Sequence, residues 1–261
     1  MLSLYGFSNS WLVAAGLNAI LLCIVWLLPK KLLTPAGIIN AWLLGVLIWG
    51  TLGFKGYAIV CVYFIVGSGV TRIGIEQKEA EGIAEKRSGA RGPENVWGSA
   101  FTAALCAVGI GIINWFGSGE GIILKSLLLL GYVASFCTKL SDTCASEVGK
   151  AYGKRTFLIT TLQPVPRGTE GAVSLEGTLA GMVASAVIAL VGYGVGLVDL
   201  MGIVYCIIAA FIATNLESVI GATLQENLEW MTNEIVNIIN TFIGAVVAIL
   251  LAWLLINFMV I

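Results

Sequence analysis

Long apolar runs are the feature that most limits how this chain can fold. Eight runs are each close to the roughly 20 residues that a helix needs to cross the hydrocarbon core of a bilayer. They lie at 8–28, 35–53, 56–74, 95–115, 121–140, 173–195, 200–223 and 236–258. Only 11% of the residues are charged, against roughly 25% in soluble domains. The sequence therefore predicts an all-α, polytopic membrane helix bundle with about eight spans, folded as one integral membrane domain over 1–261.

The polar connections between these runs predict the orientation of the chain. Two are long and charged and a third is short and acidic: 75–94, 141–172 and 225–234. If Lys30 and Lys31 are cytoplasmic and the runs alternate, all three connections face the cytoplasm, with all 14 Lys and Arg residues except Lys55 and Lys125. Cytoplasmic loops usually carry this excess of Lys and Arg. We therefore expect charged loops clustered on the cytoplasmic side and both termini on the other side.

Residue types that are absent or scattered exclude several kinds of function. His is absent, which removes the commonest general base and metal ligand, so a bound metal should be a hard cation held by carboxylates. The six Cys residues form no CxxC motif, which favours packing in apolar runs over a disulfide framework. No GxxxxGK[ST] motif occurs, which excludes a P-loop kinase. The net charge of −1 predicts no nucleic-acid partner.

Acidic residues in or beside the apolar runs mark a candidate site, because ionisable groups are costly there and functional by default. The stretch TKLSDTCASEVGKAYGKR places Asp142 and Glu147 just after the fifth run, and Glu217 lies within a later one. On one helix Asp142 and Glu147 would be about 140° apart, so that helix alone would not make them a chelating pair. Either they bind different Mg²⁺ ions or Glu147 lies past the helix end. A solvated helix end is the alternative.

Basic residues accompany these carboxylates. Arg suits bidentate contact with phosphate, and Lys acts as a point charge. Those near the acidic residues are Lys139, Lys150, Lys154, Arg155 and Arg167, and the stretch EKRSGARGPEN adds Arg87 and Arg91. Positive-inside charges would explain some of them, and a solvated basic loop is the alternative for the last two. Their interleaving with acidic residues favours a phosphate site at the membrane–cytosol boundary.

A polar stripe enters the last run. Asn233, Asn237 and Asn240 share one helical face, and such a stripe should face protein or a water-filled cavity. It either lines the site or bonds to a neighbouring helix. Glu226 and Glu229 precede it in the acidic connection.

Three stretches of the sequence resemble a known family. They are AEKRSGARGPENVWGSA, KLSDTCASEVGKAYGKRTFLITTLQPVPRGTEGAVSLEGTLAG and ATNLESVIGATLQ. Each is similar to a signature region of the integral membrane family that includes the phytyl-phosphate kinase of tocopherol synthesis. The resemblance covers nearly the whole chain from about residue 75. It implies phosphoryl transfer from a nucleoside triphosphate, with CTP suggested as donor, to phytyl monophosphate.

The residues and the resemblance together give candidate roles. The residues expected at the reacting phosphates are Asp142, Glu147, Lys139 and Arg167. The residues expected to hold Mg²⁺ are Asp142, Glu147, Glu217 and Asn215. The residues expected to contact the nucleotide or its phosphates are Arg87, Arg91, Lys150, Lys154, Arg155, Glu170, Ser174, Glu176 and Thr178.

The resemblance also implies a place in the cell and a set of partners. No transit peptide is visible, so we expect a multi-pass protein of a cyanobacterial plasma or thylakoid membrane, with its site facing the cytoplasm. The expected partners are the lipid bilayer, phytyl monophosphate and the nucleotide, and a homodimer is left open. A lipid-phosphate cytidylyltransferase is one alternative. A transporter of a small anion or lipid is another, although the far-side connections offer only Lys55, Glu120, Lys125 and Asp199 as charged groups.

Overall fold

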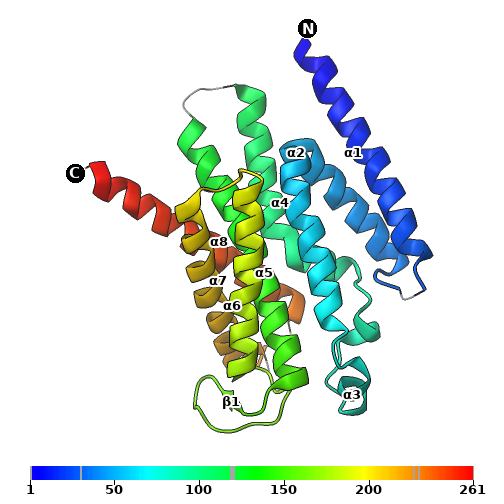
Figure 1. The fold of residues 1–261 in the computed structure, drawn as a ribbon, viewed down its shortest axis with the longest axis vertical. Coiled ribbons are helices and arrows are strands. Elements are labelled where there is room, and N and C mark those ends of the chain that lie inside the picture. Colours follow the sequence, from blue (N-terminus) through cyan, green and yellow to red (C-terminus); the bar gives the residue numbers. More distant parts are fainter. Residues whose placement is uncertain (1, 30, 118–120, 226, 229, 261) are drawn as a thin grey trace.

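The computed structural model describes residues 2–29, 31–117, 121–225, 227–228 and 230–260, so Lys30, Glu120, Glu226 and Glu229 lie outside the described residues. The described chain is a helix bundle with one two-stranded hairpin (Figure 1). Its elements are α1 (Leu2–Leu27), α2 (Pro35–Thr71), α3 (Ile75–Ala80), η1 (Lys86–Gly89), α4 (Pro93–Phe116), α5 (Ile122–Tyr152), β1 (Thr156–Leu158), β2 (Ala172–Ser174), α6 (Leu175–Gly194), α7 (Leu200–Ile220), η3 (Gly221–Gln225) and α8 (Asn233–Val260). The predicted all-α membrane bundle is confirmed.

Helix α2 accounts for two of the predicted runs. By length and composition, 7 described helices could cross a membrane. The backbone of α2 leaves helical geometry at Gly53, with φ 64° and ψ −158°, a conformation that glycine adopts readily. The chain reverses there, and its two halves run antiparallel (Figure 1). Arg72, just after α2, therefore reaches back to donate to the carbonyl oxygen of Lys31, just before it, at 3.1 Å.

Helix α5 forms the centre of the bundle and packs against α4, α6, α7 and α8. Its 31 residues span about 46 Å at the usual helical rise, more than the roughly 30 Å of a hydrocarbon core. The sequence-based span ended at residue 140, but the helix continues to Tyr152. Polar side chains in this extension find partners on the helix itself, since Thr143 donates to the Lys139 carbonyl and Ser146 to that of Asp142.

Two glycines of α6 let it approach α5 closely. A Cβ on Gly177 would lie 2.5 Å from the carbonyl oxygen of Ala145, and one on Gly181 would lie 2.9 Å from that of Ser141. Small residues allow this kind of backbone approach between membrane helices. The GTLAG segment, 177–181, therefore fixes α6 against the stretch of α5 that carries the charged residues.

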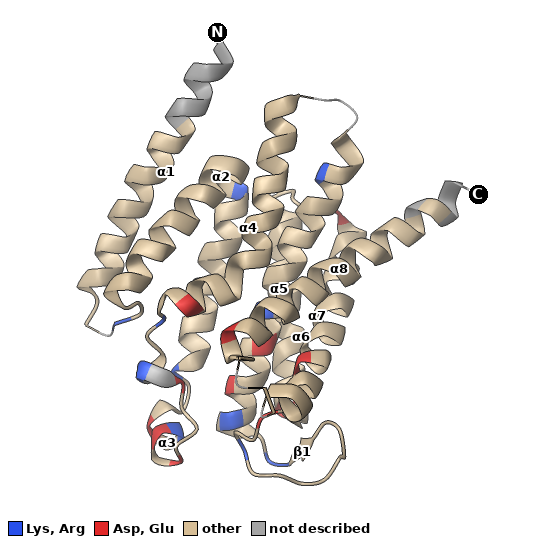
Figure 2. Ribbon diagram, turned by 180° about the vertical axis from the view of Figure 1, so that it is seen from behind, with Lys and Arg blue, Asp and Glu red and all other residues tan. Residues whose placement is uncertain are grey.

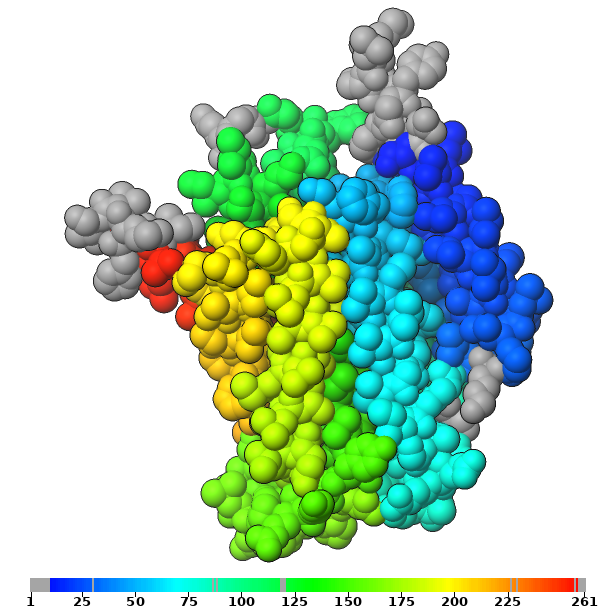
Figure 3. Space-filling view, viewed as in Figure 1, coloured from blue at the N-terminus to red at the C-terminus, as the bar shows by residue number. Residues whose placement is uncertain are grey.

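Charged residues gather at one end of the bundle (Figure 2). The polar connections that contain α3 and the β1–β2 hairpin lie side by side there (Figure 3). They touch where Arg167 donates to Glu81 at 2.8 Å and where Gly168 lies against Ile83. At the other end, Lys55 lies near Gly196 and Lys125 donates to Asn114. The bundle thus has one densely charged end, as the hydropathy pattern predicts.

Candidate functional site

A cavity of about 660 Å³ opens at the charged end. Its walls come from the polar end of α5, the start of α6, the end of α7 and the start of α8, and the residues before η1 and before β2 contribute its rim. Volumes of this size are typical of small-molecule sites. Because the cavity lies where membrane helices meet charged loops, it can receive a molecule that has both a polar and an apolar part.

Lys139 lies buried at the inner end of this cavity. Its Nζ donates to Asp142 Oδ2 at 2.6 Å and to Asn237 Oδ1 at 2.7 Å. A buried ammonium needs such partners, since removing it from water without them costs several kcal/mol. The Asn stripe predicted for the last span thus reaches the site through Asn237, and Asn233 also lines the cavity. Asn240 is fully buried and is not among the lining residues.

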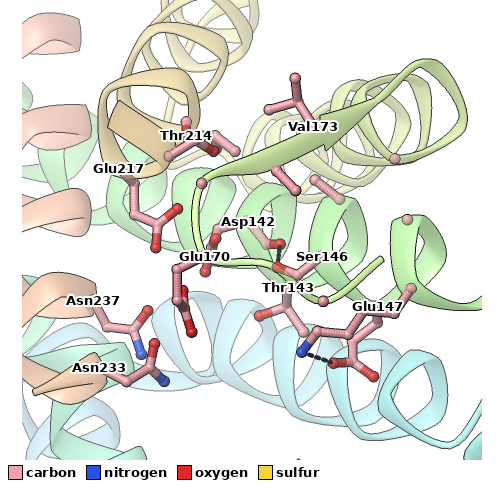
Figure 4. A pocket seen from close by; sticks show the side chains of 18 of the residues that line it. Asp142, Thr143, Ser146, Glu147, Glu170, Val173, Thr214, Glu217, Asn233 and Asn237 are labelled. Atoms are coloured by element: carbon pink, nitrogen blue, oxygen red, sulfur yellow. Dashed lines mark hydrogen bonds and ion pairs between the residues drawn. The ribbon is translucent and has the colours of Figure 1, made fainter. Parts of the chain in front are cut away.

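Three carboxylates face one another across the cavity, and we call them the acidic cluster: Asp142 of α5, Glu170 before β2 and Glu217 of α7 (Figure 4). The carboxyl of Glu217 interacts with those of Asp142 and Glu170 and with the ammonium of Lys139. One ammonium does not balance three carboxylates, and close like charges are relieved by a cation or by a shared proton. The acidic cluster can therefore take up a cation or share a proton.

Glu147 also borders the cavity, but its carboxylate lies to one side of the acidic cluster (Figure 4). It forms an ion pair with Lys78 of α3 and lies 3.5 Å from Lys150 Nζ. Lys78 is only 1% exposed, and its Nζ also donates to the carbonyl oxygen of Thr71 at 2.8 Å. The pair fastens α3 to α5. Sequence reasoning missed Lys78, because a lysine within IEQKEAEG has the appearance of a solvated loop residue.

Some of the predicted basic residues border a cavity and others do not. Lys150 and Arg87 line the cavity, and Arg87 pairs with Glu94 and donates to Asn95 at 3.1 Å. Arg91 borders a small adjoining cavity of about 60 Å³ and donates to the Tyr63 hydroxyl at 2.6 Å. The predicted site residues that line neither cavity are Lys154, Arg155, Arg167 and Glu176.

The start of α6 contributes polar groups to the same cavity. Ser174 is the N-cap of this helix, and its Oγ accepts a hydrogen bond from the Gly177 amide at 3.1 Å. Thr178 lines the cavity one turn further along, and Asn215 of α7 lines it while donating to the Phe211 carbonyl at 2.7 Å. A helix N-terminus carries partial positive charge, so this wall complements Lys139 and Lys150 in attracting an anion.

The oxygen donors of the acidic cluster fit a hard divalent cation. Mg²⁺ is usually held by one or two carboxylates together with substrate phosphate oxygens and water. Within the described ranges, no group of three His, Cys, Asp or Glu side chains could by itself hold a metal ion. Mg²⁺ is seldom bound by protein ligands alone, because it usually keeps water and substrate oxygens among its ligands. Asp142 and Glu217 are the residues that could hold such an ion, with Glu170 beside them. A cation held there would offset the negative charge of a phosphate in the cavity, together with the basic groups that line it.

Comparisons with known proteins agree with this architecture. Residues 18–245 match the family described as "Integral membrane protein DUF92". The chain is 66% identical to "Uncharacterized membrane protein sll0875" of Synechocystis sp., over 92% of this chain and 90% of that protein. It is 44% identical to "Protein VTE6, chloroplastic" of Arabidopsis thaliana, over 94% of this chain and 72% of that protein.

More distant organisms also have relatives of this chain. "Uncharacterized membrane protein MJ0933" of Methanocaldococcus jannaschii is 33% identical over 92% of this chain and 95% of its own length. No solved structure matches the chain. The family match covers every residue that lines the cavity. The protein is therefore a multi-pass member of the integral membrane protein family DUF92.

Proposed function

We propose that the protein is a phytyl-phosphate kinase, which transfers the terminal phosphoryl group of a nucleoside triphosphate to phytyl monophosphate and forms phytyl diphosphate. The observation that carries the proposal is the cavity at the charged end, where the acidic cluster and Lys139 lie within reach of the membrane interior. Similarity to a plant protein that is named chloroplastic, and to a cyanobacterial membrane protein, supports a role in photosynthetic organisms.

The chemistry requires little covalent work from the protein. An oxygen of the acceptor phosphate forms a bond to the γ-phosphorus, the bond from that phosphorus to the β–γ bridging oxygen breaks, and a nucleoside diphosphate leaves. The acceptor phosphate is already ionised, so no strong general base is needed and the lack of His is no obstacle. Positioning and charge neutralisation dominate such transfers. Lys139, Lys150 and Arg87 border the cavity where these phosphates would lie.

Mg²⁺ is the proposed cofactor, and it would neutralise the charge that develops on the transferring phosphoryl group. Asp142 and Glu217 would hold it, with Glu170 close by. Lys139 donates to one carboxylate oxygen of Asp142, which orients this side chain. CTP is the proposed donor, on the strength of the family resemblance of the sequence.

The described interior argues against transport through the bundle. Between the cavity and the far end, α5 presents Tyr132, Val133 and Phe136, all fully buried. Tyr132 donates to the Gly56 carbonyl at 2.8 Å, and its ring lies 5.4 Å from that of Phe136. Close packing of this kind blocks the passage of an anion or a lipid between the two ends of the bundle.

The test is a product analysis with purified protein in detergent. Phytyl monophosphate and Mg²⁺ are supplied with each nucleoside triphosphate in turn, and lipid and nucleotide products are identified by mass spectrometry. We expect phytyl diphosphate and the matching nucleoside diphosphate, with CTP as donor. A nucleotide-linked lipid together with pyrophosphate would instead identify a cytidylyltransferase. No product with any donor, in protein shown to be folded, would overturn the kinase.

A further inference from the structure

The cavity does not end at its charged rim, since it extends between α6 and α7 toward the bilayer. On α6, Thr178 and Met182 both line it, and they lie one turn apart on the same side of the helix. On α7, Phe211, Asn215 and Ser218 line it with the i, i+4, i+7 spacing of a single helical face. The two helices are neighbours in the bundle (Figure 1). The cavity therefore continues as a groove with polar residues near the charged end and apolar residues further in.

The apolar end of this groove is open to lipid. Met182 and Phe211 line the cavity and yet are 40% and 44% exposed. Phe211 precedes Glu217 on α7, and the usual helical rise separates them by about 9 Å along the axis. A molecule held at the acidic cluster by its charged end could therefore pass between Met182 and Phe211 and reach the hydrocarbon core.

The packing of α6 on α5 sets which of its residues face the groove. Gly177 and Gly181 face α5, where a Cβ would meet backbone oxygens, so this face of α6 is fixed. Thr178 and Met182 follow them by one residue, which turns them by about 100° away from α5. Val183 follows Met182 and is turned by about another 100°. It does not line the cavity, and it is 65% exposed. The direction in which Met182 points is thus set by the glycine contacts.

We infer that the α6–α7 groove binds the prenyl chain of the acceptor, leading it from the phosphate site into the bilayer between Met182 and Phe211. The inference rests on the proposed function. The occupant is a prenyl monophosphate, because the groove is continuous with the cation- and phosphate-binding groups and its far end is apolar. Lipid tails are as apolar as these side chains, so the groove gains little hydrophobic free energy. Its contribution is to aim the phosphate at the acidic cluster.

The direct test uses a phytyl monophosphate analogue with a diazirine on its chain, in nanodiscs that contain the full-length protein. After irradiation, labelled residues are located by peptide mass spectrometry. We expect label on α6 at or beside Met182 and on α7 at or beside Phe211, reduced by unlabelled phytyl monophosphate and unchanged by added phosphatidic acid. Label spread over lipid-facing positions such as Val183, or equal competition by phosphatidic acid, would overturn the groove as a prenyl site.

A matched pair of variants gives an independent readout. Met182→Trp narrows the groove, whereas Val183→Trp adds the same bulk to the lipid-facing side. We expect Met182→Trp to raise KM for phytyl monophosphate by roughly tenfold or more and to change KM for a one-isoprene monophosphate much less, with Val183→Trp close to wild type. Equal effects of the two variants would contradict the inference.

Failure of the groove and failure of the kinase are distinguishable in these experiments. Diphosphate product with label outside the groove would refute the groove alone. Competed label in the groove without diphosphate product from any donor would refute the kinase and leave a prenyl-phosphate-binding groove.

Discussion

Replacement of Lys78 tests whether its buried ion pair with Glu147 holds the first charged connection on the bundle. In Lys78→Met the Glu147 carboxylate remains buried, with Lys150 Nζ 3.5 Å away as a partly exposed substitute. Breaking a buried pair by removing one partner costs about 3–5 kcal/mol. Because Lys150 recovers part of the interaction, we expect the lower end, about 3 kcal/mol of unfolding free energy.

The double variant Lys78→Met/Glu147→Leu removes both charges. Replacing a buried pair by apolar residues is often neutral for stability. We therefore expect the unfolding free energy of the double variant to lie within about 1 kcal/mol of the wild-type value. Reversible SDS unfolding in mixed micelles measures both variants, and Lys154→Met serves as the exposed-lysine control. A Lys78→Met variant as stable as the control, or a double variant as unstable as the single one, would show that the buried pair does not hold α3 on α5.

The same variants bear on the predicted role of Glu147 as an Mg²⁺ ligand. If Glu147 only fastens α3 to α5, the double variant should keep the wild-type Mg²⁺ dependence of turnover. If Glu147 binds the ion, the double variant should need much more Mg²⁺ even though it is folded.

Further predictions concern the acidic cluster, the contact between the two connections and the α5–α6 packing. Asp142→Asn should lower kcat by roughly 100-fold or more, the usual cost of losing a charge-stabilising group, and normal turnover in folded protein would exclude Asp142 from the site. Arg167→Ala should change thermal stability little, because exposed ion pairs contribute about 0.2–1 kcal/mol. It should speed proteolysis of the connection 153–171, because this connection loses its contact with Glu81. Unchanged proteolysis would disprove that contact. Gly177→Ala should cost about 1–3 kcal/mol by overpacking, since its Cβ would lie 2.5 Å from the Ala145 carbonyl oxygen. Gly16→Ala, with nothing within 4 Å, is the control in the same unfolding assay, and equal stability of the two variants would contradict the packing argument.

Hydropathy was sufficient to predict the bundle and its charged end. Each spanning helix satisfies its own backbone and needs only length and apolar character, which local sequence records directly. The reversal at Gly53 lies at the boundary expected between the runs 35–53 and 56–74, although the glycine lies inside a nearly continuous apolar stretch. The end of α5 was placed too early at residue 140. Its polar residues Lys139, Asp142 and Glu147 are buried by neighbouring segments, and a hydropathy window does not register that packing.

The sequence was sufficient to predict the chemical character of the site, but it was less informative about which residues line the cavity. Asp142, Glu217 and Lys139 were expected together and do line one cavity, since each lies at the polar end of an apolar run. The partner of Glu147 was not predictable, because Lys78 is 69 positions away and reaches α5 only through the fold. Arg167 was expected at the phosphates, but the structure turns it toward Glu81. Arg and Lys in polar loops look alike in sequence whether they face a cavity or a neighbouring loop.

The most direct test of the proposed kinase activity follows labelled phosphate from donor to lipid. Purified protein with Mg²⁺ and phytyl monophosphate is given CTP labelled at either the γ- or the α-phosphorus, beside the Asp142→Asn variant. We expect γ label to enter phytyl diphosphate, α label to stay in CDP, and the variant to transfer little of either. Appearance of α label in the lipid fraction, or no γ label in lipid with CTP or any other γ-labelled triphosphate, would contradict the kinase activity.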